Sequence, residues 1–127
     1  KYKGADNVAV VSDSLRCAGM PADGRLYNLG SKYDSAALKV KVSDGIAMLA
    51  DGSKFAGSIT SVHKMVKNLI NAGIPVVDAF KTGTSVPARI IGEKKIGSVK
   101  KGFAADLCEL NENFDIVSVF LDGKKVK

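Results

Sequence analysis

Several residue types that build catalytic and binding sites are scarce in this 127-residue sequence. It has no tryptophan, one histidine and two cysteines. A closed zinc site takes about four converging histidine, cysteine or carboxylate ligands, so this chain alone is not expected to complete one. An aromatic content of 6% leaves few rings on which bases could stack, so we expect no nucleic-acid partner.

Long apolar runs are also missing. No stretch approaches the roughly 20 apolar residues that a membrane-spanning helix needs, and no apolar segment near the start looks like a secretory signal. We therefore expect no membrane partner and a cytoplasmic location. Cys17 and Cys108 lie far apart, and two cysteines do not make a disulfide scaffold, so free thiols are favoured.

What the sequence does contain is typical of a folded domain. Hydrophobic residues make up 46% of it and charged residues 25%. Its 19 basic and 13 acidic residues give a net charge of +6. Most basic residues are lysines scattered along the chain, which indicates a solvated surface rather than a clustered binding face.

The apolar pattern predicts a mixture of helices and strands. The continuous apolar run at residues 8–11 is typical of a strand buried on both faces of a parallel sheet. Alternation around Asp44-Gly45 predicts a β-hairpin over about 38–50. Further helices are predicted over 59–70, 75–80 and 86–91, and further strands over 96–99, 107–110, 114–121 and 124–127.

The ends of the longest predicted helix are also readable. Ser58 or Thr60 is expected to cap its start, and Gly73 followed by Pro75 to end it. His63 lies on this helix between Val62 and Lys64, which favours a boundary position over a metal-ligand role.

Asp13 is the sharpest candidate for chemistry because it directly follows the predicted strand at residues 8–11. A carboxylate at the carboxyl end of a buried parallel strand lies where α/β proteins place their reactive groups. The alternative is that Asp13 only caps the Ser12-Asp13-Ser14 turn with its side chain. The residues themselves leave both interpretations open.

Four segments form a recognisable series of motifs. They read VVSDSLRCAGMPADGRLYNLG, VKVSDGIAMLADGSKFAGS, KTGTSVPARIIG and IGSVKKGFAADLCEL. In this order, and over essentially the whole chain, they resemble the C-terminal third of the N-acetylglucosamine-6-phosphate deacetylases, a family of the metal-dependent amidohydrolase superfamily. The last two segments are generic to the superfamily, whereas the first two are more specific to the deacetylases.

The resemblance implies an α/β fold that is part of a larger architecture. Residues 1–92 would form the C-terminal part of a (β/α)8 barrel, with residues 8–12 as its eighth strand and the hairpin at about 38–50 as a flap. Residues 93–127 would add strands to a small β-sandwich domain. Because the rest of the barrel is missing from this sequence, the 127-residue chain alone is expected to be inactive.

The resemblance also implies a reaction and its residues. Asp13 would be the catalytic general acid and base, and Phe55, Ala56 and Gly57 would line the sugar pocket. The cofactor would be a divalent metal, zinc or iron, whose ligands lie outside this sequence apart from a contact that Asp13 could make. The expected partner is a phosphorylated amino sugar, and the expected assembly is a homo-oligomer.

Two other interpretations remain. The generic tail also fits another amidohydrolase, such as a dihydroorotase-like enzyme or a deaminase, although the segment ending in FAGS argues against this. A basic surface with many predicted strands would also suit a non-catalytic binding module. Release of acetate and analysis of bound metal would separate these possibilities.

Overall fold

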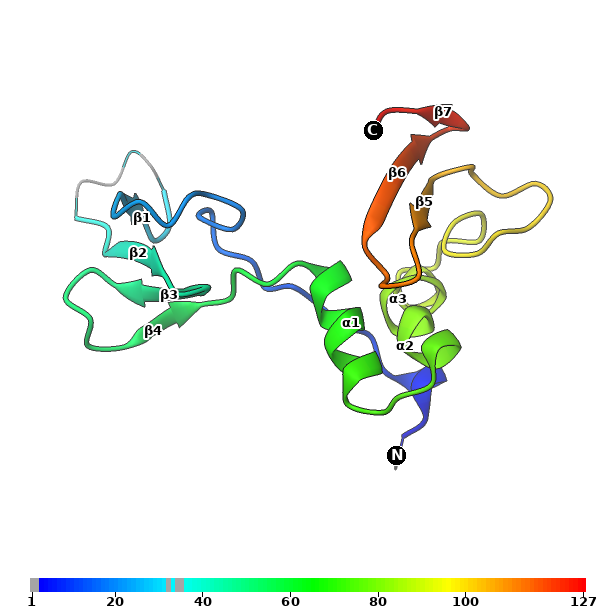
Figure 1. Ribbon diagram of the computed structural model, residues 1–127, viewed down its shortest axis with the longest axis horizontal. Helices are drawn as coiled ribbons and strands as arrows, with labels where there is room; N and C mark the ends of the chain where they lie inside the picture. The colour runs from blue at the N-terminus through cyan, green and yellow to red at the C-terminus, as the bar shows by residue number, and fades with distance from the viewer. Residues whose placement is uncertain (1–2, 32, 34–35) are drawn as a thin grey trace. The chain divides into compact units, whose positions relative to one another are not determined.

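The computed structural model describes residues 3–31, 33 and 36–127. The chain folds into two compact units. The four-stranded unit is Val11–Met65, and the mixed unit combines Lys1–Val10 with Val66–Lys127. The chain is therefore an α/β protein, as predicted, with one antiparallel sheet in each unit (Figure 1). The expected division at residues 92 and 93 stays a prediction.

The elements follow one another along the chain in a simple order. The 3-10 helix and the first four strands are η1 Ala5–Asn7, β1 Leu26–Asn28, β2 Lys39–Ser43, β3 Ile46–Leu49 and β4 Phe55–Gly57. Next come the helices α1 Val62–Asn71, α2 Val76–Gly83 and α3 Ser85–Ile90. The last strands are β5 Leu107–Leu110, β6 Ile116–Leu121 and β7 Lys124–Lys125.

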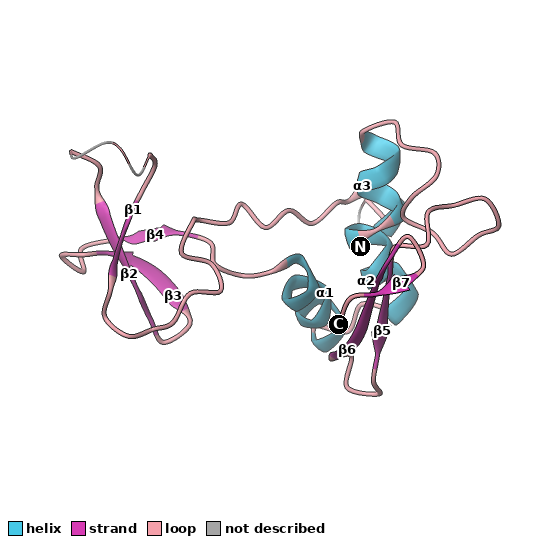
Figure 2. Ribbon diagram, turned by 90° about the horizontal axis from the view of Figure 1, so that it is seen from above, coloured by secondary structure: helices cyan, strands magenta, loops and turns pink. Residues whose placement is uncertain are grey.

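The sheet of the four-stranded unit has the order β1-β2-β3-β4, with every neighbouring pair antiparallel (Figure 2). The predicted hairpin over 38–50 is confirmed, because β2 pairs with β3 from Val40 opposite Leu49 to Ser43 opposite Ile46. Asp44 and Gly45 both have positive φ, at 51° and 75°, as a two-residue type I′ turn requires. β1 is a strand that the sequence pattern did not predict.

A small core lies within the four-stranded unit. It consists of Cys17, Val40, Val42 and Ala47, each 7% exposed or less. Residues of intermediate burial surround it, namely Leu15, Tyr27, Leu29, Leu49, Ala56 and Ile59. The alternation of Val40 and Val42 with lysines in β2 is what turns one strand face toward this core.

The cysteines are both free, as predicted: Cys17 is buried in this core and Cys108 is exposed on β5. None of the helices in the described part of the chain has the length and apolar character that crossing a bilayer requires.

Helix α1 begins and ends with backbone and side-chain caps. The Ser61 hydroxyl accepts a hydrogen bond from the Lys64 N–H at 3.2 Å, so the cap is Ser61 and the predicted Ser58 or Thr60 was wrong. At the other end the Ile74 N–H donates to the Leu69 carbonyl at 3.0 Å, which is part of a Schellman motif. Gly73, with φ 84°, occupies the left-handed position there, as the sequence predicted.

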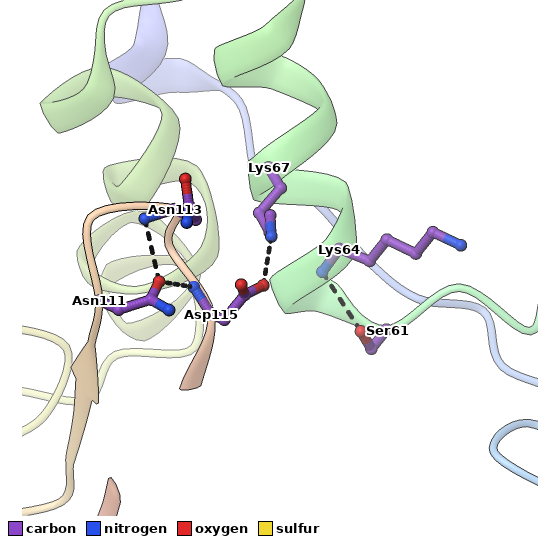
Figure 3. A network of polar contacts seen from close by, with 6 residues as sticks. All are labelled: Ser61, Lys64, Lys67, Asn111, Asn113 and Asp115. Atoms are coloured by element: carbon purple, nitrogen blue, oxygen red, sulfur yellow. Dashed lines mark hydrogen bonds and ion pairs between the residues drawn. The ribbon is translucent and has the colours of Figure 1, made fainter. Parts of the chain in front are cut away.

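The sheet of the mixed unit has the order β5-β6-β7. The turn from β5 to β6 is closed by the Asn111 side chain, whose oxygen accepts from the N–H groups of Asn113 at 3.0 Å and Asp115 at 2.8 Å (Figure 3). The carboxylate of Asp115 also pairs with the Lys67 ammonium of α1 at 2.5 Å. This turn is therefore tied to the helix within the same unit.

Two predicted strands were wrong. Residues 8–11 are extended but belong to no strand, and Val8 and Val11 are 41% and 73% exposed. A segment becomes a strand only beside a partner backbone, and in the described residues the one bond from this segment to a distant part of the chain is from the Val10 N–H to the Thr82 carbonyl at 2.9 Å. Residues 96–99 form no strand either, since Gly97 has φ 79° and packs closely on α3.

The boundaries of the last strands also differ from the prediction. β6 begins at Ile116 rather than at 114, because Phe114 has φ 59° and completes the preceding turn. β7 covers only Lys124–Lys125.

The loop after α3 approaches the helix so closely that only glycine fits at position 97. A Cβ on Gly97 would lie 2.8 Å from the Thr84 carbonyl oxygen and 3.0 Å from both the Ala88 Cβ and the Ser85 Cα. Gly102 has a similar φ of 84°, but a Cβ there would meet nothing within 4 Å. Comparing substitutions at the two glycines therefore distinguishes the cost of backbone strain from the cost of steric crowding.

We expect Gly97→Ala to destabilise the mixed unit more than Gly102→Ala does. Both variants strain a left-handed residue, but only the first forces backbone atoms apart, which adds about 1–3 kcal/mol. Amide hydrogen exchange of α3 in the two variants measures the difference. Equal losses of stability would contradict the close approach.

One polar atom of the four-stranded unit is buried without a partner. The Tyr27 hydroxyl is shielded from solvent, and among the described residues it makes no hydrogen bond. Burying an unpaired hydroxyl costs about 1–3 kcal/mol, whereas the ring of the same residue packs on the core and stabilises it.

We expect Tyr27→Phe to leave the free energy of unfolding unchanged or to raise it by up to about 1 kcal/mol, because the unpaired hydroxyl is removed and the ring is kept. Tyr27→Ala serves as the control and should lose about 3 kcal/mol or more with the ring. Denaturant unfolding followed in the four-stranded unit measures both. A clear loss with phenylalanine would show that the hydroxyl has a stabilising partner.

Candidate functional site

Asp13 lies where the extended segment meets the four-stranded unit. Its backbone has φ 43°, in the left-handed region, and its side chain is exposed. The next residue, Ser14, forms an isolated parallel bridge with Ser58, and the Leu15 N–H donates to the Ser58 carbonyl at 2.9 Å. The local backbone around Asp13 is therefore held from one side only, directly after it.

The carboxylate of Asp13 has no hydrogen bond or ion pair with any other described residue. A capping aspartate would accept a hydrogen bond from a backbone N–H one to three residues on, as the Asp51 carboxylate does from Ser53 at 2.9 Å. The hydrogen bond that the capping interpretation of Asp13 requires is therefore not found among the described residues. A left-handed aspartate with a free carboxylate is instead available for contacts outside these units.

The segment Phe55–Gly57 is the short strand β4, at the edge of the same sheet. Phe55 pairs with Met48 and is 75% exposed, and Gly57 pairs with Ala47. The register shifts between these two pairs, so β4 carries an irregularity at its centre. Gly57 has φ 141°, a conformation that residues with a Cβ rarely adopt.

The parallel bridge lies directly after the predicted site residues. Because Ser14 lies opposite Ser58, it pairs the residue that follows Asp13 with the residue that follows Gly57. The segments that carry the predicted catalytic residue and the predicted substrate-binding residues are therefore joined within the four-stranded unit, although they are far apart in sequence. Ala56 differs from its neighbours, since its side chain packs toward the core.

Leu15 is a residue at this site that the sequence analysis did not single out. A Cβ on Gly57 would lie 3.1 Å from the Leu15 Cγ and Cδ2 and 3.2 Å from its Cδ1. The sequence shows an apolar residue two positions after Asp13 and a glycine in the FAGS segment. Neither feature predicts that Leu15 lies against Gly57.

A complete metal centre is not formed by the described residues, which contain no group of three or more histidine, cysteine, aspartate or glutamate side chains near one another. His63 is half-buried on α1. The exposed carboxylate of Asp13 fits a single contact to a cation and no more.

The two groups of the described chain whose pKa is shifted, Asp51 and Lys81, are not among the predicted site residues. The backbone N–H and the hydroxyl of Ser53 lower the pKa of Asp51. The carboxylate of Asp6, through a hydrogen bond and its charge at 3.3 Å, raises the pKa of Lys81.

Comparison with known proteins places this arrangement in context. The model of the amidohydrolase family matches residues 6–126. The chain is 27% identical over 125 residues to the N-acetylglucosamine-6-phosphate deacetylase of Haemophilus influenzae, covering 98% of the chain and 31% of the relative. It is 31% identical over 65 residues to an adenine deaminase of Methanothrix thermoacetophila. This match covers 51% of the chain and 12% of the deaminase.

A solved structure shows the same local architecture. The crystal structure of the N-acetylglucosamine-6-phosphate deacetylase from Thermotoga maritima superposes with a TM-score of 0.79 at 29% identity. The match covers 97% of this chain and 32% of that one. The chain thus spans about a third of the length of these two deacetylases.

Replacing Asp13 by glycine tests whether its side chain stabilises the turn. We expect Asp13→Gly to keep the free energy of unfolding of the four-stranded unit or to raise it by up to about 1 kcal/mol, because glycine adopts φ 43° without steric cost. Urea unfolding compares this variant with Asp13→Asn, which keeps the shape. A loss near 1 kcal/mol or more with glycine would restore the capping interpretation.

Proposed function

This chain belongs to the amidohydrolase family, and from that membership we propose that it is the C-terminal part of a deacetylase. The proposed enzyme hydrolyses N-acetylglucosamine 6-phosphate to glucosamine 6-phosphate and acetate. The observation that supports it most is the bridge from Ser14 to Ser58, which joins the segment of Asp13, whose side chain is exposed, to the segment expected to bind the sugar. Its relatives in Haemophilus influenzae and Thermotoga maritima carry the deacetylase name.

In the proposed reaction Asp13 moves one proton. Its carboxylate accepts a proton from the attacking water as the new C–O bond forms, and then donates it to the amide nitrogen as the C–N bond breaks. The products are acetate and the free amine. A divalent metal, zinc or iron, would acidify the water and polarise the amide, with ligands from outside the described residues and at most a contact from Asp13.

The strand β4 would supply the sugar subsite. The exposed ring of Phe55 offers an apolar face, and the lack of a side chain at Gly57 lets the backbone approach a ligand closely. The groups that bind the phosphate are proposed to lie outside this sequence.

The larger architecture proposed for the enzyme is a (β/α)8 barrel with a small β-sandwich domain. Residues 1–92 would belong to the barrel and residues 93–127 to the sandwich. Residues 8–11 are extended and apolar and have few backbone partners, which is what a barrel strand separated from its neighbours would look like. Such a segment, together with exposed apolar residues such as Val99, supports a homo-oligomer. The location proposed for the enzyme is the cytoplasm.

The match to an adenine deaminase supports a second candidate, another amidohydrolase that releases ammonia instead of acetate. That match covers half of this chain, whereas the match to the deacetylase covers nearly all of it. Assays for acetate and for ammonia, with N-acetylglucosamine 6-phosphate and adenine as substrates, decide between the two.

We expect Asp13→Asn to lower kcat by about 100-fold or more in a full-length protein that carries this sequence, because the amide keeps the shape but cannot accept the proton. Acetate release from N-acetylglucosamine 6-phosphate in the presence of zinc or iron(II) measures it. In the same assay we expect the 127-residue chain alone to release no acetate.

The matched control is Asp44→Asn. Asp44 also has a left-handed backbone, with φ 51°, lies in the same unit and is exposed in the hairpin turn. It should leave kcat unchanged. Near-normal turnover in Asp13→Asn would remove Asp13 from the proposed mechanism.

A further inference from the structure

The side chain of Leu15 fills the space that a side chain at position 57 would occupy. Its Cγ, Cδ1 and Cδ2 atoms all lie 3.1–3.2 Å from where a Cβ on Gly57 would be. Such a distance is shorter than ordinary van der Waals contact between carbon atoms. Leu15 therefore packs directly onto the backbone of Gly57 at the end of β4.

Leu15 is held to the four-stranded unit in two further ways. Its N–H donates to the Ser58 carbonyl at 2.9 Å. Its side chain also belongs to the partly buried shell of the core around Cys17, Val40, Val42 and Ala47. One residue thus joins the segment that carries Asp13 both to the core and to the residues that follow β4.

This contact defines which residues can face each other across the bridge. The Ser14–Ser58 bridge is isolated, so its pairing alone does little to define a register. A shift by one residue would place Ala56 or Ser58 where Gly57 now lies, and the Cβ of either would lie about 3.1–3.2 Å from Leu15 side-chain atoms unless that side chain moved. Glycine is the residue that accepts Leu15 in its present place, so the pair favours one register.

We propose that Leu15 is a positioning residue, which acts through Gly57 to hold the Asp13 carboxylate in a fixed place beside the segment Phe55–Gly57. The inference rests on the proposed function, because it assigns Leu15 a part in placing the general acid and base. The proposed role is more specific than core packing. A residue that only packs on the core can be replaced by another apolar residue of similar volume, whereas this role needs the contact with Gly57.

The test compares two leucines that pack on the same core. Leu15→Ala removes the side chain nearest to the space beside Gly57, whereas Leu29→Ala removes a leucine of the same shell that is not among the atoms nearest to that space. In a full-length protein that carries this sequence, we expect kcat per folded active site to fall about 10- to 100-fold in Leu15→Ala, with KM changed less than threefold. Leu29→Ala should destabilise the unit and keep kcat, and Leu15→Met should recover most of the activity.

A double-variant experiment asks whether the effect passes through Gly57. Gly57→Ala in the wild-type background brings a methyl group against Leu15, whereas in the Leu15→Ala background the methyl group has room. We expect Gly57→Ala to lower kcat by a clearly smaller factor in the second background. Equal factors in both backgrounds, or equal losses of kcat in Leu15→Ala and Leu29→Ala, would overturn the proposal.

A second measurement keeps this proposal separate from the proposed function. The residue-15 amide is bonded to the Ser58 carbonyl, and its hydrogen exchange, corrected for intrinsic rates, reports the register without any turnover. Leu15→Ala should speed this exchange at least about tenfold, and Leu29→Ala should not. A full-length wild type that releases no acetate would refute the deacetylase while this result still stands, whereas unchanged exchange in Leu15→Ala would refute the positioning role.

Discussion

The candidate site depends on one short parallel contact, in which Ser14 faces Ser58 and the Leu15 side chain lies on Gly57. The other strand pairs of the described chain are antiparallel and join segments that are close in sequence. This contact brings the segment of Asp13 to the residues that follow the edge strand β4. Because the contact has a single hydrogen bond of 2.9 Å, side-chain packing must supply the specificity that a longer ladder would otherwise provide.

The extended segment before Asp13 shows how strongly strand formation depends on partners. Residues 8–11 have the composition of a buried strand, yet among the described residues their one backbone bond to a distant segment is to Thr82, and Val8 and Val11 are exposed. Backbone N–H and C=O groups on such a segment need partners, and water or another chain segment can supply them. The proposed barrel would give this segment the neighbours that its composition requires.

Local signals in the sequence succeeded where the structure is decided by a few adjacent residues. Asp44-Gly45 predicted the hairpin because both residues tolerate positive φ, and Gly73 predicted the end of α1 for the same reason. The prediction of a cap at Ser58 or Thr60 was wrong because three neighbouring hydroxyl residues look alike in sequence. Only the position where the helix actually begins makes Ser61 the residue whose oxygen meets the Lys64 N–H.

The sequence by itself determined the family, through motifs that keep their order over the whole chain, and it determined the short-range elements and the candidacy of Asp13. The tertiary structure decided that Ser14 pairs with Ser58, that the Asp13 carboxylate has no capping bond in the described residues, and that the Leu15 side chain lies against Gly57. The first and the last of these relations join residues more than forty positions apart. They follow from packing across the unit, which no local propensity or spacing records.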